Sequence, residues 1–293
     1  MMKRVRNLIL REMMQLPVLQ NITELAYYEA LEKHARDLPQ LSADDSLLIK
    51  EITAKGAFIT NEENLSIPST STILQSAEKL LPRLRESRVD KDDITIHATS
   101  AQIMDYPELF LWGLEERLLD IAENYLGLPV AYHGVYFRRD IANQIHDRSR
   151  LWHVDMEDRR VLKVIVYLND INDECGPFQY ISKPLSALFC DSLKYSYGYL
   201  KDETVQSVIP ISDWQSCVGK KGTVIFADTG SVLHRGKIPL ELDRYTLFFD
   251  YTSRQPERKF YCKSSLPMDD LRKLEKQLSP RQKECVFWRN PKN

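Results

Sequence analysis

Apolar residues in the first third of the chain recur at the three- and four-residue spacing of helices. The four predicted helices begin near the capping-box pair Asn21 and Glu24, at Ser42 with a stop at Gly56, at Thr70 with an end or kink at Pro82, and at Asp105 with a stop at Gly127. The periodic positions of the first helix are Leu25, Tyr28, Leu31, Ala35 and Leu38, and we expect them to form one buried face.

After Pro129 the pattern changes to short β-type runs separated by turn residues. Eight strands are predicted, at 130–137, 151–155, 161–168, 178–181, 205–209, 223–227, 232–234 and 245–251. Leu271, Leu274 and Leu278 predict one further helical face near the C-terminus. This succession of short strands is typical of a sandwich or jelly roll, so the expected fold is mainly β with helices.

The 293 residues could form one or two domains of about 150 residues. No internal repeat, low-complexity tract or linker divides them, which favours a single domain. We expect residues 1–128 to be a mostly helical buttress, 129–262 a jelly-roll core, and 263–293 a C-terminal helix and tail.

Composition narrows the classes of function. With 43% hydrophobic and 28% charged residues the chain is an ordinary globular protein, and its net charge of -2 makes nucleic acid an unlikely partner. No apolar run reaches membrane-spanning length, and Arg11 and Glu12 interrupt the run before them, so neither a membrane partner nor a secretion signal is expected. Five widely spaced cysteines without a C-x-x-C pair indicate a reducing, cytoplasmic location.

His153 and Asp155 are two residues apart, and on a strand such residues project to the same face. Alone, this pair is as consistent with a surface ion pair as with a site. His234 follows further along, and Arg244 lies ten residues after it. Two histidines and one carboxylate can form the facial triad of non-haem iron, which leaves positions open for a cosubstrate and dioxygen.

Arg244 supplies a second feature of such a site. A carboxylate that enters a mostly apolar barrel must be paired, and a guanidinium can pair it with two parallel hydrogen bonds. Taken singly, Arg244 could be a strand-edge surface arginine and His234 a loop histidine. Their joint spacing with His153 and Asp155 favours a metal and cosubstrate site.

The sequence resembles the iron(II)- and 2-oxoglutarate-dependent dioxygenases, and within them the phytanoyl-CoA dioxygenase-like branch. The similar segments are 151–155, 163–170, 174–178, 222–236 and 244–246. The resemblance implies a double-stranded β-helix of the jelly-roll or cupin type, buttressed by the N-terminal helices. It also implies that His153, Asp155 and His234 are the catalytic metal ligands, and that Arg244 binds the distal carboxylate of 2-oxoglutarate.

Three further residues are implied as cosubstrate contacts. Tyr167 corresponds to a tyrosine of the family that hydrogen-bonds 2-oxoglutarate, although a buried tyrosine with a satisfied hydroxyl is the alternative. Gln144 and Thr246 resemble polar residues that some relatives direct at the cosubstrate. Trp152 could line the substrate pocket or simply pack, and His146 precedes the matched motif, which favours a loop position.

The implied activity is oxidative decarboxylation of 2-oxoglutarate coupled to hydroxylation, desaturation or cyclisation of a small-molecule substrate, with iron(II), 2-oxoglutarate and dioxygen required. Asp155 argues against halogenation, which needs that ligand position free. The alternative is a non-redox cupin that binds a metal or ligand, or a catalytically degenerate relative. Neither the substrate nor the oligomeric state can be read from the sequence, and the long segment 182–206 suggests a lid.

Overall fold

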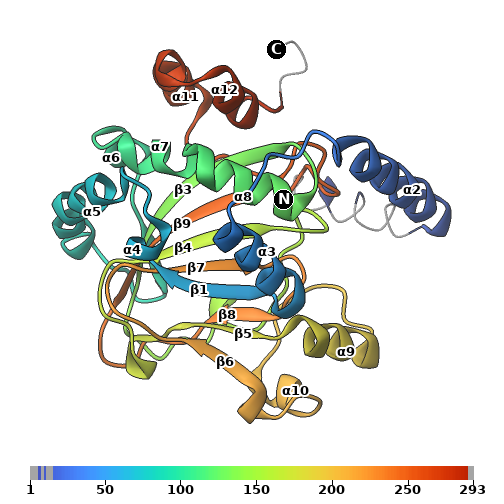
Figure 1. Ribbon diagram of the computed structural model, residues 1–293. Coiled ribbons are helices and arrows are strands. Elements are labelled where there is room, and N and C mark those ends of the chain that lie inside the picture. Colours follow the sequence, from blue (N-terminus) through green and yellow to red (C-terminus); the bar gives the residue numbers. More distant parts are fainter. Residues whose placement is uncertain (1–5, 8–9, 11–15, 290–293) are drawn as a thin grey trace.

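The computed structural model describes residues 6–7, 10 and 16–289, and it contains two antiparallel sheets with helices around them (Figure 1). The strands are β1 (Ala57–Asn61), β2 (Thr95–His97), β3 (Val130–Asp140), β4 (Leu162–Tyr167), β5 (Phe178–Ile181), β6 (Trp214–Cys217), β7 (Thr223–Asp228), β8 (His234–Gly236) and β9 (Arg244–Ser253). The helices are α2 (Pro17–His34), α3 (Ala43–Lys55), α4 (Glu62–Leu65), α5 (Thr70–Arg85), α6 (Ser100–Met104), α7 (Glu108–Leu111), α8 (Glu116–Leu126), α9 (Lys183–Leu193), α10 (Asp202–Gln206), α11 (Met268–Leu274) and α12 (Pro280–Val286).

The larger sheet has six strands in the order β1-β7-β4-β9-β3-β2, and the smaller has three in the order β6-β5-β8. Every neighbouring pair within the two sheets is antiparallel. In Figure 1 the smaller sheet lies below the larger one, on the side away from α7 and α8. The prediction of a mainly β protein with additional helices is confirmed.

Alternation along the strands separates a helix-facing side of the large sheet from an inner side. On β4, Val164 and Val166 belong to the core beneath the helices, whereas Ile165 and Tyr167 belong to a second core that also contains Phe178 of the small sheet. The inner side is therefore shared by both sheets. Polar inner residues are found on the same alternating positions, and they form the site described below.

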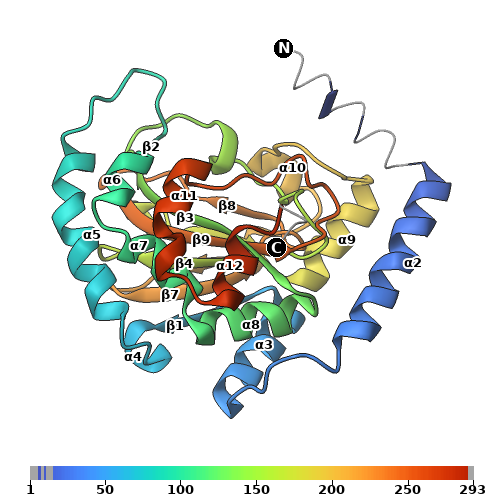
Figure 2. The ribbon, with the colours of Figure 1, turned by 90° about the horizontal axis from the view of Figure 1, so that it is seen from above.

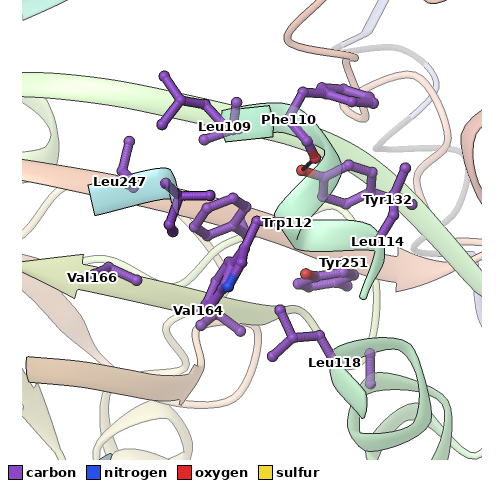
Figure 3. Packing of buried hydrophobic residues seen from close by; sticks show 14 of the residues in the cluster. Leu109, Phe110, Trp112, Leu114, Leu118, Tyr132, Val164, Val166, Leu247 and Tyr251 are labelled. Carbon is purple, nitrogen blue, oxygen red and sulfur yellow. Dashed lines mark hydrogen bonds between the residues drawn. The ribbon is translucent and has the colours of Figure 1, made fainter. Parts of the chain in front are cut away.

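The helix-facing core is centred on Trp112, which follows α7. Its ring lies 4.7 Å from that of Phe249, and its Nε1 donates to the hydroxyl of Thr70 at 3.0 Å. Figure 3 shows it among Val164 and other outward side chains of the large sheet. Figure 2 shows α11 and α12 lying over the same sheet. Truncation of such a buried aromatic typically costs 3 to 5 kcal/mol, roughly, so this packing is a main source of stability.

Helix α3 forms as predicted, because the Ser42 hydroxyl accepts from the amide of Asp45 and Gly56 ends it with φ 93°. Helix α5 does not end at Pro82 but continues to Arg85. Pro82 is exposed near the last turn, so water can satisfy the carbonyl that loses its partner.

The single helix predicted between Asp105 and Gly127 is instead three pieces. Helix α7 leads into a 3-10 turn over Trp112–Leu114, and Glu115 then adopts an extended ψ of 136° before α8. Burial of Trp112 accompanies this break. Gly127 ends α8 with φ 70°, as predicted.

Helix α2 departs from the prediction in start and orientation. It begins at Pro17, upstream of the predicted capping box, and its predicted buried face is largely exposed, with Leu25 64% and Tyr28 58% accessible. The side that faces the body carries Ala26 and Ala30, which border a cavity with Leu128. Within the described residues, no helix has the length and apolar character needed to cross a membrane.

The strand predictions at 130–137, 161–168, 178–181, 223–227 and 245–251 are confirmed within a few residues, and 232–234 shifts to β8. The prediction at 205–209 is wrong, because α10 and a turn occupy it. Val205 and Ile209 are four apart and both buried, which suits a helical turn as well as a strand. Strands β1, β2 and β6 were not predicted.

Gly56 fits its place because it lacks a side chain. An added Cβ would overlap Cγ1 of Val232, whereas at Gly198, which also has positive φ, it would meet no atom of the described residues within 4 Å. Gly56→Ala should therefore lower the free energy of unfolding by about 1 to 3 kcal/mol more than Gly198→Ala, measured by denaturant unfolding. Equal losses would show that Val232 moves aside freely.

Candidate active site

Backbone hydrogen bonds hold His153 and His234 opposite each other. The amide of His153 donates to the carbonyl of His234 at 3.0 Å, and the amide of His234 donates back at 2.9 Å. The amide of Asp155 donates to the carbonyl of Thr229 at 2.9 Å. The prediction of a regular strand at 151–155 is therefore wrong, because the segment forms only isolated β-bridges. These bridges join two parts of the chain that are distant in sequence.

The side chains of His153, Asp155 and His234 converge. One possible ligand atom from each lies within 4.8 Å of the other two. Nε2 of His153 is 3.8 Å from Oδ1 of Asp155, and Nε2 of His234 is 3.7 Å from Oδ2 of the same carboxylate. The structure therefore brings together the three residues that the sequence motif singled out.

Both imidazoles present an unprotonated Nε2 to the centre of this cluster. Nδ1 of His153 lies 2.8 Å from the carbonyl of Leu151, and Nδ1 of His234 lies 3.1 Å from that of Val232. A carbonyl only accepts, so each Nδ1 carries the proton and each Nε2 keeps its lone pair. Burial lowers the pKa of His153 and lowers that of His234 to about 3, so both rings are neutral at neutral pH.

Asp155 is ionised because of its neighbours. Burial favours the neutral acid, but the ammonium of Lys163 lowers the pKa of the carboxyl below its usual value. Nζ of Lys163 is 2.6 Å from Oδ2 of Asp155. Two neutral imidazoles with oriented Nδ1–H groups and one carboxylate are a donor set that fits iron(II).

A cavity extends from this cluster along the inner side of the large sheet. Arg138, Thr246 and Tyr167 form one row across three neighbouring strands. The residues that line the cavity are Arg138, Ser149, His153, Lys163, Ile165, Tyr167, Phe178, Thr229, His234, Gly236, Arg244, Thr246 and Phe248. Both histidines of the triad and the predicted clamp Arg244 therefore open onto one space.

Arg244 is held by hydrogen bonds within the protein. Its Nε and Nη2 lie 3.3 and 3.0 Å from Oδ2 of Asp140, and its Nη1 donates to the carbonyl of Gly176. A guanidinium carries five N–H donors, so these contacts hold its orientation without using all of them. Thr246, also predicted, is buried on the same wall, and its hydroxyl oxygen has no hydrogen-bond partner within the described part of the chain.

Arg138 is a charged residue that the sequence reading missed. It extends from β3, donates to Oδ1 of Asp140 at 2.6 Å and lies over the ring of Phe248. Burial favours the neutral form of Asp140, but Arg138 and Arg244 lower its pKa well below the usual range. Two guanidiniums thus share one carboxylate, which leaves positive charge for an anion. The strand predicted at 130–137 ends just before Arg138, and the observed strand continues to Asp140, which places Tyr136, Arg138 and Asp140 on alternating positions.

The other predicted positions have different outcomes. Tyr167 lines the cavity, but its hydroxyl donates to the carbonyl of Cys217 at 2.7 Å and accepts from the amide of Phe178 at 3.0 Å. This geometry favours the alternative of a buried tyrosine with a satisfied hydroxyl. Gln144 is exposed and does not border this cavity. Trp152 packs against Trp214 with ring centroids 4.9 Å apart.

His146 is exposed, as a loop residue would be. The long segment 182–206 folds into α9 and α10, and the turn between them carries Tyr199. The ring of Tyr199 lies 5.2 Å from that of His153, edge to face. The segment therefore borders the triad, as the predicted lid would.

A second and larger cavity of about 540 Å³ lies beyond the triad. His153, Asp155 and Lys163 line it, together with Glu157 and Asp250. Burial, and after it the charge of Asp155, raises the pKa of Glu157 to about 7. The triad thus lies between an arginine-containing cavity and one lined by carboxylates.

No family model and no curated protein matches the chain. Similar solved structures include HygX from Streptomyces hygroscopicus with nickel, 2-oxoglutarate and hygromycin B (TM-score 0.48, 18% identity, 73% of this chain and 88% of that one). A second is EctD from S. alaskensis with 2-oxoglutarate and 5-hydroxyectoine (TM-score 0.48, 22% identity, 73% of this chain and 76% of that one). A third is the epimerase SnoN with Fe3+, alpha ketoglutarate and nogalamycin RO (TM-score 0.49, 15% identity, 72% of this chain and 84% of that one). At such identities, the residues of this site are assigned from their own geometry.

Buried His133 makes stability depend on pH. Burial lowers its pKa in the folded chain to about 3, against about 6.5 when unfolded, so its contribution is complete above pH 6.5 and is lost as the pH falls. Between pH 7 and 5 the wild type should lose about 2 kcal/mol of unfolding free energy more than His133→Gln. Denaturant titrations at both pH values measure this, and an identical pH dependence of the two proteins would contradict it.

Proposed function

We propose that the chain is an iron(II)- and 2-oxoglutarate-dependent oxygenase. The proposal rests on one observation about the smaller cavity. Two oriented imidazoles of the His-Asp-His cluster line it, and so do Arg138 and Arg244. A metal site alone would need no buried cation next to it. A metal site with a cationic wall suits a dianionic cosubstrate that binds metal at one end and guanidinium at the other.

The proposal assigns a separate role to each residue of the site. Nε2 of His153, Nε2 of His234 and the carboxylate of Asp155 would hold iron. Iron with 2-oxoglutarate would supply the activation of dioxygen: one oxygen atom enters succinate as carbon dioxide is released, and the other either enters the substrate or leaves as water when the substrate loses two hydrogens. Arg244 and the unpartnered hydroxyl of Thr246 would bind the distal carboxylate, at the end of the cavity away from the triad.

The remaining walls exclude water and fix orientation. Ile165, Phe178 and Phe248 supply apolar surface, which strengthens the pairing of a carboxylate with Arg244 by lowering the local dielectric. Lys163 holds the second oxygen of Asp155, so it would orient that ligand. The substrate would enter from the larger cavity, where it could be hydroxylated, desaturated or cyclised.

The wider predictions fit this proposal. The two sheets would be the halves of a double-stranded β-helix, and the chain a single oxygenase domain with the helices of residues 1–128 as its buttress. Strands β1 and β2 come from that helical part and extend the large sheet. All five cysteines are free, which supports a reducing, cytoplasmic location.

Removal of a ligand should abolish both metal binding and turnover. We expect Asp155→Ala and His153→Ala to lose anaerobic iron(II) binding, followed by calorimetry, and to form no succinate from 2-oxoglutarate in air. Asp147→Ala is the matched control, because Asp147 is an exposed carboxylate that pairs with Arg148 outside the cavity. A wild type that binds metal but neither binds nor consumes 2-oxoglutarate would establish the non-redox cupin instead.

Removal of the clamp should affect 2-oxoglutarate selectively. Arg244→Ala should raise the KM for 2-oxoglutarate by about 100-fold, since a charge-assisted bidentate pair is worth a few kcal/mol, while iron(II) affinity stays within a few fold. Arg88→Ala serves as the matched control, because Arg88 is an exposed arginine that pairs with Asp90 outside the cavity. An unchanged KM in the Arg244 variant would place the clamp elsewhere, with Arg138 the next residue to test.

A further inference from the structure

We propose that the larger cavity, on the side of the triad away from Arg244, binds the primary substrate through a cationic amine. This inference rests on the proposed oxygenase function, because it assigns the substrate class of the same centre. It is carried by two buried polar atoms that line this cavity, one of Asp250 and one of His133, which have no hydrogen-bond partner among residues 6–7, 10 and 16–289.

The two cavities lie at opposite ends of the row of inward-facing residues on strand β9 (the inner row). Thr246 and Phe248 line the arginine cavity, whereas Asp250 and Thr252 line the larger one. Lys163 pairs with Asp250 in the ladder between β4 and β9, and it borders both cavities. Along this row the chemical character changes from cationic to anionic.

The carboxyl group of Asp250 is the first of the two groups that carry the proposal. Its Oδ1 is fully shielded from solvent and has no hydrogen-bond partner within the described residues. The ammonium of Lys163 makes its short contact, 2.6 Å, with Asp155 instead. A buried carboxylate oxygen without a donor costs several kcal/mol, roughly, so a bound ligand that donates to it gains correspondingly.

His133 provides an independent second acceptor. It is 5% exposed, and its Nε2 lies 2.8 Å from the hydroxyl of Thr252. That hydroxyl donates its proton to the carbonyl of Ser253, so it must accept from His133, and Nε2 carries the proton. Nδ1 is then an acceptor, and it has no partner within the described part of the chain. Nδ1 of His133 and Oδ1 of Asp250 therefore both require donors.

The remaining walls favour a cation over a neutral donor. Glu157 adds a further carboxyl group, which is partly ionised at neutral pH, and the second lysine, Lys263, is exposed. The rings of Phe260, Tyr261 and Tyr199 also line the cavity, and aromatic faces attract ammonium groups. An alkyl ammonium offers three donors and a positive charge, whereas an alcohol offers one donor and a carboxylate offers none. The cavity volume of about 540 Å³ suits a small molecule.

The test uses three probes with one carbon skeleton: cyclohexylmethylamine, cyclohexylmethanol and cyclohexanecarboxylate. Their binding to the full-length, metal-free protein is measured by ligand-observed NMR, which needs no turnover. We expect the amine to bind at least 10-fold more tightly than the alcohol, and the carboxylate not to bind. In Asp250→Asn the amine should lose this advantage, whereas Asp147→Asn, the matched exposed control, should keep it.

Equal binding of amine and alcohol to the wild type would overturn the proposal without any variant. A preference that survives both in Asp250→Asn and in His133→Phe, with folding of each checked by circular dichroism, would overturn it as well. Failure of the oxygenase function is a separate result, because it appears as absent succinate and absent 2-oxoglutarate binding whatever the probes do. With active enzyme, the amine should also stimulate succinate release at a lower concentration than the alcohol.

Discussion

The site depends on the paired backbone hydrogen bonds between His153 and His234. These residues are far apart in sequence, and one belongs to an irregular segment while the other begins the short strand β8. Because each residue donates to the other, the two Cα atoms and both side-chain directions are set together. The Nδ1 contacts to Leu151 and Val232 then fix the ring orientations. Loss of this bridge would separate the histidines even with every ligand residue present.

The charged residues of the inner face are mostly arranged in pairs, because burying an unpaired charge costs free energy. A charge in this space must be paired, and most of them are: Asp140 with two arginines, and Asp155 with Lys163. The exceptions are informative because they lie at the two ends of the inner row. Excess positive charge remains near Arg244, and unsatisfied acceptors remain near Asp250. We interpret both as ligand sites: an anionic ligand would pair with the charge near Arg244, and a ligand with donor groups would satisfy the acceptors near Asp250.

Much of the architecture could be predicted from local pattern, since strands such as β4 and β9 are short runs rich in β-branched and aromatic residues. The convergence of His153, Asp155 and His234 could also be predicted, because these residues match the motif of the family that the sequence resembles. Strand β1 could not, because it forms by pairing with β7, which lies far away in sequence. The orientation of α2 was equally hidden, since its apolar periodicity does not tell which residues meet the body.

Arg138 and Tyr167 show why side-chain roles are harder to predict than positions. Arg138 belongs to no motif, and its importance appears only when Asp140 and Arg244 are brought beside it. Tyr167 occupies the position expected of it, yet its one proton is donated to the carbonyl of Cys217. A strand pattern specifies which face a residue occupies, whereas hydrogen-bond partners depend on segments that pack later. The outward residues of β9 pack against the helices, while its inward residues Arg244, Thr246 and Asp250 border the two cavities.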